Sequence, residues 1–199
     1  MENKKTGFHY AWIVFVATVV MNFVFSIVYS TFSLYAGKVL EANPDITRTA
    51  YSVIPTLHSV FATVFLLTYG KIVQKLGFRK IMLLGGIGLA VGFFIYSIAQ
   101  SIGVFYIGAV FVAMLPAFCS STTTGALINR WYGKLNTTLL SISMAIGGFG
   151  GTVGSSIVGN WLGTIGYKAS FRNMGLLMLV TMVIVFLVVR NNPADKGTV

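Results

Sequence analysis

The first long apolar stretch of the chain carries polar side chains on one face. They follow one another at intervals of four, three and four residues, which is the spacing of one face of an α-helix: Asn22, Ser26, Tyr29 and Ser33. In lipid such groups must face protein or water, because an unsatisfied polar group in hydrocarbon is costly. We interpret the stripe as one wall of a solute-binding cavity, since Tyr29 is bulky and amphipathic. The alternative is hydrogen bonding between helices.

A second polar cluster is consecutive rather than periodic. Its members are Cys119, Ser120, Ser121, Thr122, Thr123 and Thr124. On helical geometry about a third of these side chains can face one cavity, and the others face lipid or bond to their own helix. Periodicity does not select among them; we assign Thr123 to the substrate pathway.

Residues for enzyme or metal chemistry are missing from the predicted spans. One cysteine and two histidines, His9 and His58, cannot form a cysteine–histidine metal cage. No predicted span holds the Asp or Glu that hydrolysis or metal catalysis would use. We therefore expect a protein that is not an enzyme, with no metal and no cofactor. His58 lies inside a span; we favour a hydrogen-bonded structural histidine over a proton relay, because it has no carboxylate partner.

The composition is that of a membrane protein. Of 199 residues, 56% are hydrophobic and only 9% are charged, with a mean hydropathy of +0.83; soluble domains are about 25% charged. The net charge of +10 could suggest a nucleic-acid partner, but the bases lie between apolar runs. The expected partners are the lipid bilayer and a small-molecule substrate, with no nucleic acid.

Six apolar stretches are long enough to cross a bilayer, which takes about 20 residues. They cover residues 10–35, 50–69, 81–99, 103–127, 138–162 and 174–189. The first is too long for a signal peptide and is interpreted as a retained span. The sequence therefore predicts an all-α membrane protein formed by a single bundle of six transmembrane helices.

Basic residues are distributed unequally between the two sides that this topology defines. The side with both termini holds Lys4, Lys5, Lys71, Lys75, Arg79, Lys80, Arg130, Lys134, Arg190 and Lys196. The opposite side holds Lys38, Arg48, Lys168 and Arg172. Because cytoplasmic loops are enriched in lysine and arginine, we expect a multi-pass protein of the cell membrane with both termini cytoplasmic.

A short pattern occurs twice, three spans apart. The pattern is Gly-x6-Gly followed by an aromatic and a basic residue. Its two glycines are Gly70 and Gly77 in the first copy, and Gly159 and Gly166 in the second. In the predicted topology the copies lie on opposite sides of the membrane. This arrangement is typical of an inverted three-plus-three repeat, as found within six-helix halves of secondary transporters.

The fifth predicted span contains small residues at intervals of four: Gly147, Gly151, Ser155 and Gly159. Small residues at this spacing let a neighbouring helix backbone approach closely. We predict that these residues form a helix-packing seam.

The basic connection after the second span resembles the signature of the major facilitator superfamily. That signature reads approximately G-x-x-x-D-R-x-G-R-R, and the matching or chemically similar positions here are Gly70, Lys75, Gly77, Arg79 and Lys80. The acid of the signature is replaced by Gln74, and Phe78 stands where a base is common.

A second connection, which contains Arg130 and Trp131, resembles the I-x-R-W-F turn of the oxalate/formate antiporter and monocarboxylate porter branches. Without the resemblance, Arg130 is most simply a topology anchor and Trp131 an interfacial aromatic residue. The resemblance implies the N-terminal half of an alternating-access secondary transporter, an antiporter or symporter. Its substrate would be a small organic anion, such as a mono- or dicarboxylate. The second half would be a missing C-terminal half or a second copy of the chain.

One alternative of a different kind fits the length. A six-helix membrane solute-binding subunit of a multi-component uptake system would have a similar size, but the two basic connections would then be unexplained.

Overall fold

The computed structural model describes residues 3–132 and 136–190, which are almost entirely helical. In chain order the elements are α1 (Asn3–Thr31), the 3-10 helix η1 (Phe32–Leu34), α2 (Tyr35–Ala42), α3 (Arg48–Ile98), α4 (Ile102–Val112), α5 (Met114–Phe118), α6 (Ser121–Tyr132), α7 (Asn136–Thr164) and α8 (Gly166–Val188). By length and apolar composition, five continuous helical stretches of this part could cross a membrane. The expected all-helical, multi-pass architecture is confirmed at this level.

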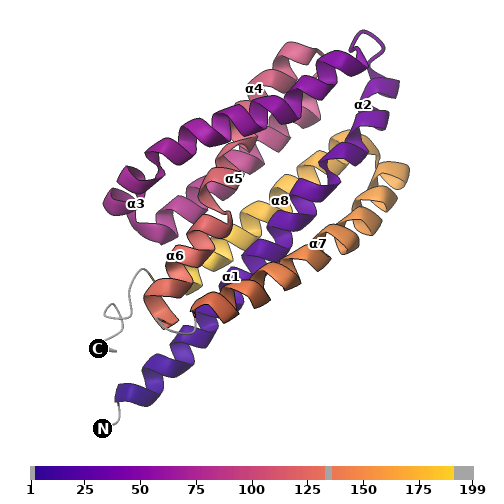
Figure 1. The fold of residues 1–199 in the computed structure, drawn as a ribbon. Helices are drawn as coiled ribbons and strands as arrows, with labels where there is room; N and C mark the ends of the chain where they lie inside the picture. Colours follow the sequence, from indigo (N-terminus) through magenta and orange to yellow (C-terminus); the bar gives the residue numbers. More distant parts are fainter. Residues whose placement is uncertain (1–2, 133–135, 191–199) are drawn as a thin grey trace.

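The helix α3 folds back on itself at Gly77. Its 51 residues would span about 75 Å if straight. Gly77 has φ 76° and ψ 165°, a conformation essentially restricted to glycine. As a result His58 and Tyr96, which are 38 residues apart, are joined by a hydrogen bond of 2.7 Å. We call residues 48–76 the first limb and 78–98 the second limb; Figure 1 shows them side by side.

Hydroxyl side chains mark two breaks in otherwise continuous helical stretches. Thr31 Oγ1 donates to Ile27 O at 2.7 Å, and α1 ends there in η1 before α2 continues. Thr123 Oγ1 donates to Phe118 O at 2.8 Å, across the break between α5 and α6. Such bonds from a side chain to its own helix are known to bend helices.

The helix boundaries extend two of the predicted spans. The segment after the first span stays helical to Ala42, and Lys38 pairs with Glu41 at 2.7 Å within that last part. The last helix begins at Gly166, well before the predicted residue 174. The positive φ of Gly166, 76°, reverses the chain within one residue, so the basic residues after it are helical.

The start of α1 and the end of α8 lie at the same end of the bundle. Figure 1 shows the start of α1, the end of α8 and the Gly77 turn at one end, and the connections 43–47 and 99–101 at the other. The Tyr10 hydroxyl accordingly donates a hydrogen bond to the carbonyl of Val188.

Two glycines allow the second limb of α3 and α8 to cross closely. A Cβ placed on Gly86 would lie 2.4 Å from Met182 Cγ, and one on Gly175 would lie 3.2 Å from Phe93 Cβ. The two contacts are related by one offset of 89 positions, from 86 to 175 and from 93 to 182. Neither helix could approach the other this closely with a larger residue at its glycine.

Candidate functional site

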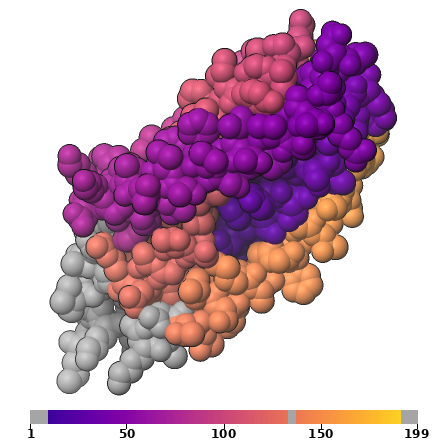
Figure 2. Space-filling view, turned by 45° about the horizontal axis from the view of Figure 1, so that its top comes forward, coloured from indigo at the N-terminus to yellow at the C-terminus, as the bar shows by residue number. Residues whose placement is uncertain are grey.

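One face of the molecule is hollowed along α1. Figure 2 shows α1 (indigo) recessed between the first limb of α3 (purple) and α7 (orange), with α6 at one end. Two of the cavities that open on α1 receive side chains from the predicted polar stripe. The hollow is therefore the candidate solute site.

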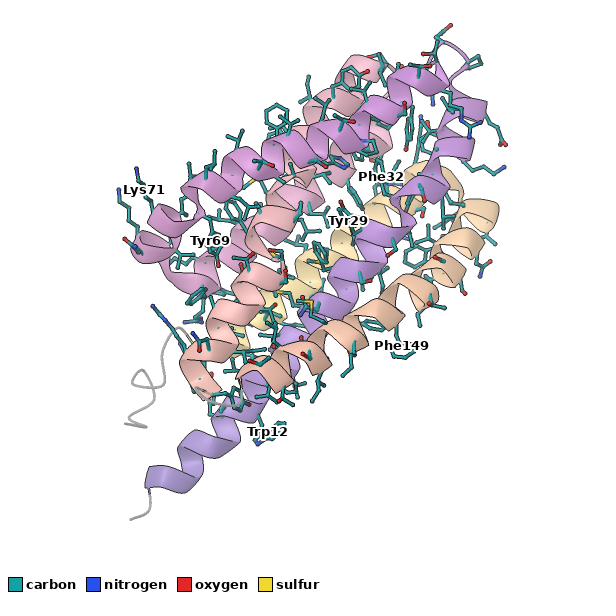
Figure 3. All side chains as sticks on the ribbon, viewed as in Figure 1. Trp12, Tyr29, Phe32, Tyr69, Lys71 and Phe149 are labelled. Carbon is teal, nitrogen blue, oxygen red and sulfur yellow. The ribbon has the colours of Figure 1, made fainter. Side chains whose placement is uncertain are left out.

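The first cavity, which we call the Tyr29 cavity, has a volume of about 220 Å³. Its lining is mainly apolar and comes from α1, η1, both limbs of α3, α4 and α5: Val28, Tyr29, Phe32, Ser33, Pro55, His58, Phe93, Val112, Leu115 and Pro116. Figure 3 shows Tyr29 and Phe32 in the space between α1 and α3. The Tyr29 side chain is 59% exposed and stacks on Phe25 with ring centroids 5.7 Å apart. Its hydroxyl is available to a solute that enters the hollow.

The second cavity, which we call the Asn22 cavity, has a volume of about 280 Å³. It is lined by Asn22, Phe25, Ser26, Ser120, Ser121, Met144, Gly147 and Gly148. The predicted stripe is thus divided, with Asn22 and Ser26 at one cavity and Tyr29 and Ser33 at the other. Ser120 and Ser121, rather than Thr123, are the members of the consecutive cluster that line a cavity.

Asn22 has protein partners for both ends of its amide. Its Nδ2 donates to Ser143 Oγ at 2.7 Å, and its Oδ1 accepts from Thr124 Oγ1 at 3.4 Å. The side chain is 5% exposed and links α1 to α7 and α6. For this residue, the structure shows the helix-to-helix bonding that the sequence left as the alternative.

Thr123 is placed away from both cavities. It is fully buried; its hydroxyl accepts from Tyr69 OH at 2.9 Å and donates to Phe118 O. These bonds hold the break between α5 and α6 against the first limb of α3, so Thr123 supports the site rather than lining it.

His58 lies at the Tyr29 cavity. Its Nε2 is bonded to Tyr96 OH at 2.7 Å, and its ring meets Phe32 edge to face with centroids 5.0 Å apart. The sequence placed His58 in a span, but nothing in the spacing of nearby residues indicated that it would line a cavity.

The basic connection at Gly77 is tied to the end of α8. Arg79 donates to the carbonyl of Phe186 from Nε at 2.9 Å and from Nη2 at 2.7 Å, and its guanidinium lies 4.6 Å from the Phe186 ring. A positive group at the last carbonyls of a helix is favourable. Lys75 and Lys80 are exposed, and Figure 3 shows Lys71 pointing away from the bundle. Within this connection, Arg79 and the turn at Gly77 therefore hold the fold, and the lysines remain at the surface.

The second basic connection contacts the first. The guanidinium of Arg130 lies 5.0 Å from the ring of Phe78, and Trp131 packs on Tyr10 with centroids 5.6 Å apart. The residues that carry the two signature-like turns are therefore at one end of the bundle.

The sequence model of the Major Facilitator Superfamily matches residues 9–199. The chain belongs to the major facilitator superfamily. Members of this superfamily are secondary transporters and not enzymes. No curated protein matches the sequence.

The packing seam of this superfamily member on α7 overlaps the predicted one only in part. A Cβ on Gly150 would lie 2.3 Å from Phe23 O, and one on Gly154 would lie 2.7 Å from Ile27 Cγ2. Gly147 and Gly151 also lie against α1, but no atom lies within 4 Å of a Cβ on Gly159, and Ser155 is exposed. The packing seam within this chain is therefore Gly147, Gly150, Gly151 and Gly154, without Ser155 and Gly159.

Ser155 and Gly159 instead belong to an uncovered stripe on α7, which runs through Ser141, Ala145, Gly148, Thr152, Ser155 and Gly159. A second uncovered stripe on the first limb of α3 runs through Ser52, Thr56, Ser59, Thr63, Leu66 and Gly70. Each position of the second stripe lies 89 residues before its counterpart in the first. Eleven of these twelve residues are glycine, alanine, serine or threonine, and the elements that carry the two stripes, the first limb of α3 and α7, lie on either side of α1.

Proposed function

We propose that this chain is one half of a secondary active transporter that moves a small organic anion by alternating access, as an antiporter or symporter. The observation that carries the proposal is the hollow along α1, in a chain matched by the superfamily model from residue 9 to residue 199. Two cavities open on it, and hydroxyls from α1 reach both.

The proposed substrate class is a mono- or dicarboxylate. The Tyr29 cavity, about 220 Å³, is below the roughly 300–1,000 Å³ of sites for drug-sized ligands, which suits a solute of a few carbon atoms. Tyr29 and Ser33 can donate hydrogen bonds to a carboxylate. The resemblance of the Arg130–Trp131 turn to the oxalate/formate and monocarboxylate branches supports the same class.

Two shared features support a transporter architecture of six crossings arranged as an inverted repeat. The two limbs of α3 would each cross the membrane once, because the chain reverses at Gly77. Gly77 and Gly166 share φ 76°, and the Gly86–Met182 and Gly175–Phe93 contacts share the same offset. Repeats of this kind place the substrate at their interface.

The second half would cover the hollow. The uncovered stripes on α7 and the first limb of α3 flank it on opposite sides, and small residues permit close helix contact. A further six-helix unit, on a continued chain or in a second copy, would pack there and close the hollow. The excess of basic residues at the end with the termini supports cytoplasmic termini in the cell membrane.

Carboxylate binding to the full chain in lipid nanodiscs tests this function. Radiolabelled lactate and oxalate are the probes, and we expect saturable binding of at least one of them. Tyr29→Ala should weaken it about tenfold, since a hydrogen bond to a charged group contributes roughly 1.5–3 kcal/mol.

Tyr132→Phe is the matched control. Its hydroxyl is buried without a hydrogen-bond partner and its ring packs on Trp12 and Phe15, far along the chain from Tyr29. Binding of neither probe, or equal binding by the Tyr29→Ala and wild-type chains, would refute the assignment.

A further inference from the structure

We propose that His58 takes up one proton when a carboxylate enters the Tyr29 cavity, and that the resulting imidazolium is the counter-charge for the anion. The inference deepens the proposed function and rests on it. It gives His58 a proton-binding role, which the sequence alone ranked below a purely structural one.

The described lining of the Tyr29 cavity carries no permanent charge. Tyr29, Ser33 and His58 are the groups with polar side chains among its described lining, and no Asp, Glu, Lys or Arg is present there. Burying an ionised carboxylate without a partner costs several kcal/mol. Histidine is the side chain that gains a positive charge near neutral pH, so His58 can supply that partner.

Both limbs of α3 position the His58 ring at the cavity. The first limb of α3 carries His58 into the cavity wall, and Tyr96 from the second limb holds Nε2 at 2.7 Å. A phenol hydroxyl can donate to a ring nitrogen or accept from it. The Tyr96 bond can therefore persist in both protonation states, and Nδ1 is the nitrogen left for a ligand.

The groups around the His58 ring decide whether another charge could interact with it. The cavity that it lines is also bounded by Tyr29, Ser33 and Phe32 from α1 and η1, and by the apolar Val112, Leu115 and Pro116 from α4 and α5. The titratable groups around it are Tyr96 across the hydrogen bond, Tyr29 at the cavity, and Tyr51, which stacks on Phe32 with centroids 6.2 Å apart. Tyrosines remain neutral near pH 7, so no neighbour among the described residues competes with the substrate for the charge on His58.

The proton balance follows directly. One proton passes from water to the imidazole as one carboxylate binds, and the pair enters as a neutral unit; no covalent bond forms or breaks. Release of the anion on the other side returns the proton there. The substrate and the proton would therefore move together.

Nitrogen-15 NMR of the imidazole tests the inference in the full chain in nanodiscs. Because the chain has two histidines, a His9→Gln background leaves His58 as the single histidine signal. At pH 7 we expect the signals of neutral imidazole to be replaced by those of imidazolium as lactate is added. Lactamide, a neutral analogue of similar shape, should cause no change.

The binding affinity gives a second measurement. Coupling to the uptake of one proton predicts that lactate affinity falls about tenfold for each unit by which the pH rises, over the range in which His58 is neutral in the free chain. His58→Gln, which can keep a hydrogen bond to Tyr96, should remove that slope.

The outcomes separate the inference from the proposed function. Saturable lactate binding with His58 still neutral would overturn the inference and leave the transporter assignment intact. A pH slope retained in His58→Gln would overturn it as well. If lactate does not bind at all, both the inference and the carboxylate assignment fail.

Discussion

Gly77 and Gly166 have the same positive φ, 76° at each. Gly77 joins the two limbs of α3, and Gly166 is the first residue of α8, directly after the connection from α7. Each lies 89 residues from the other in a repeated Gly-x6-Gly pattern. Both turns that reverse the chain therefore use a glycine at positive φ.

Alanine at either position should destabilise the protein. A side chain at such a positive φ costs roughly 1–3 kcal/mol, so Gly77→Ala and Gly166→Ala should each lower the thermal midpoint in detergent. Gly37→Ala is the control, because a Cβ there meets no atom within 4 Å and its φ is not positive. Equal midpoints for all three variants would show that neither turn needs glycine.

The packing seam gives a second prediction. A Cβ on Gly150 would lie 2.3 Å from the backbone oxygen of Phe23, whereas a Cβ on Gly148 meets no atom within 4 Å. Gly150→Ala should therefore separate α1 from α7 and lower the thermal midpoint, at a cost of about 1–3 kcal/mol for overpacking. Gly148→Ala, two residues away on the same helix, should leave the isolated chain unchanged. A larger loss in Gly148→Ala would place the contact with α1 on the other face.

The seam also shows how far the sequence could be interpreted. The small residues of α7 were recognisable, but glycines at 147, 148, 150, 151, 154 and 159 form several overlapping series at intervals of four. Periodicity could not decide which series contacts α1, because the partner helix is not visible in it. The reversal at Gly77 was predictable, since a basic, glycine-containing connection cannot remain in hydrocarbon.

The polar stripe on α1 was partly predictable for a similar reason. Helical spacing put Asn22 and Tyr29 on one face, but it could not reveal that Ser143 on α7 engages the Asn22 amide. Likewise, His58 reaches the cavity only because the second limb returns Tyr96 beside it. Both contacts join residues far apart in the chain, which local patterns do not encode.

The orientation can be tested with single cysteines. Lys75 and Asp45 are exposed at opposite ends of the bundle, and the natural Cys119 is fully buried. In intact cells an impermeant thiol reagent should label Asp45→Cys and not Lys75→Cys, with the wild-type chain as the unlabelled baseline. Labelling of Lys75→Cys alone would reverse the predicted topology.

The central claim is that six helices form one half of a carrier, and flux measured at controlled chain density tests it most directly. Liposomes would be reconstituted from many chains per vesicle to fewer than one, with oligomeric state measured in parallel and radiolabelled lactate and oxalate as solutes. A hollow bounded by one half cannot be closed on both sides of a membrane in turn. We therefore predict no saturable flux from single chains, and flux only where a second six-helix unit is present. Saturable carboxylate flux from vesicles that each hold a demonstrated monomer would contradict the account.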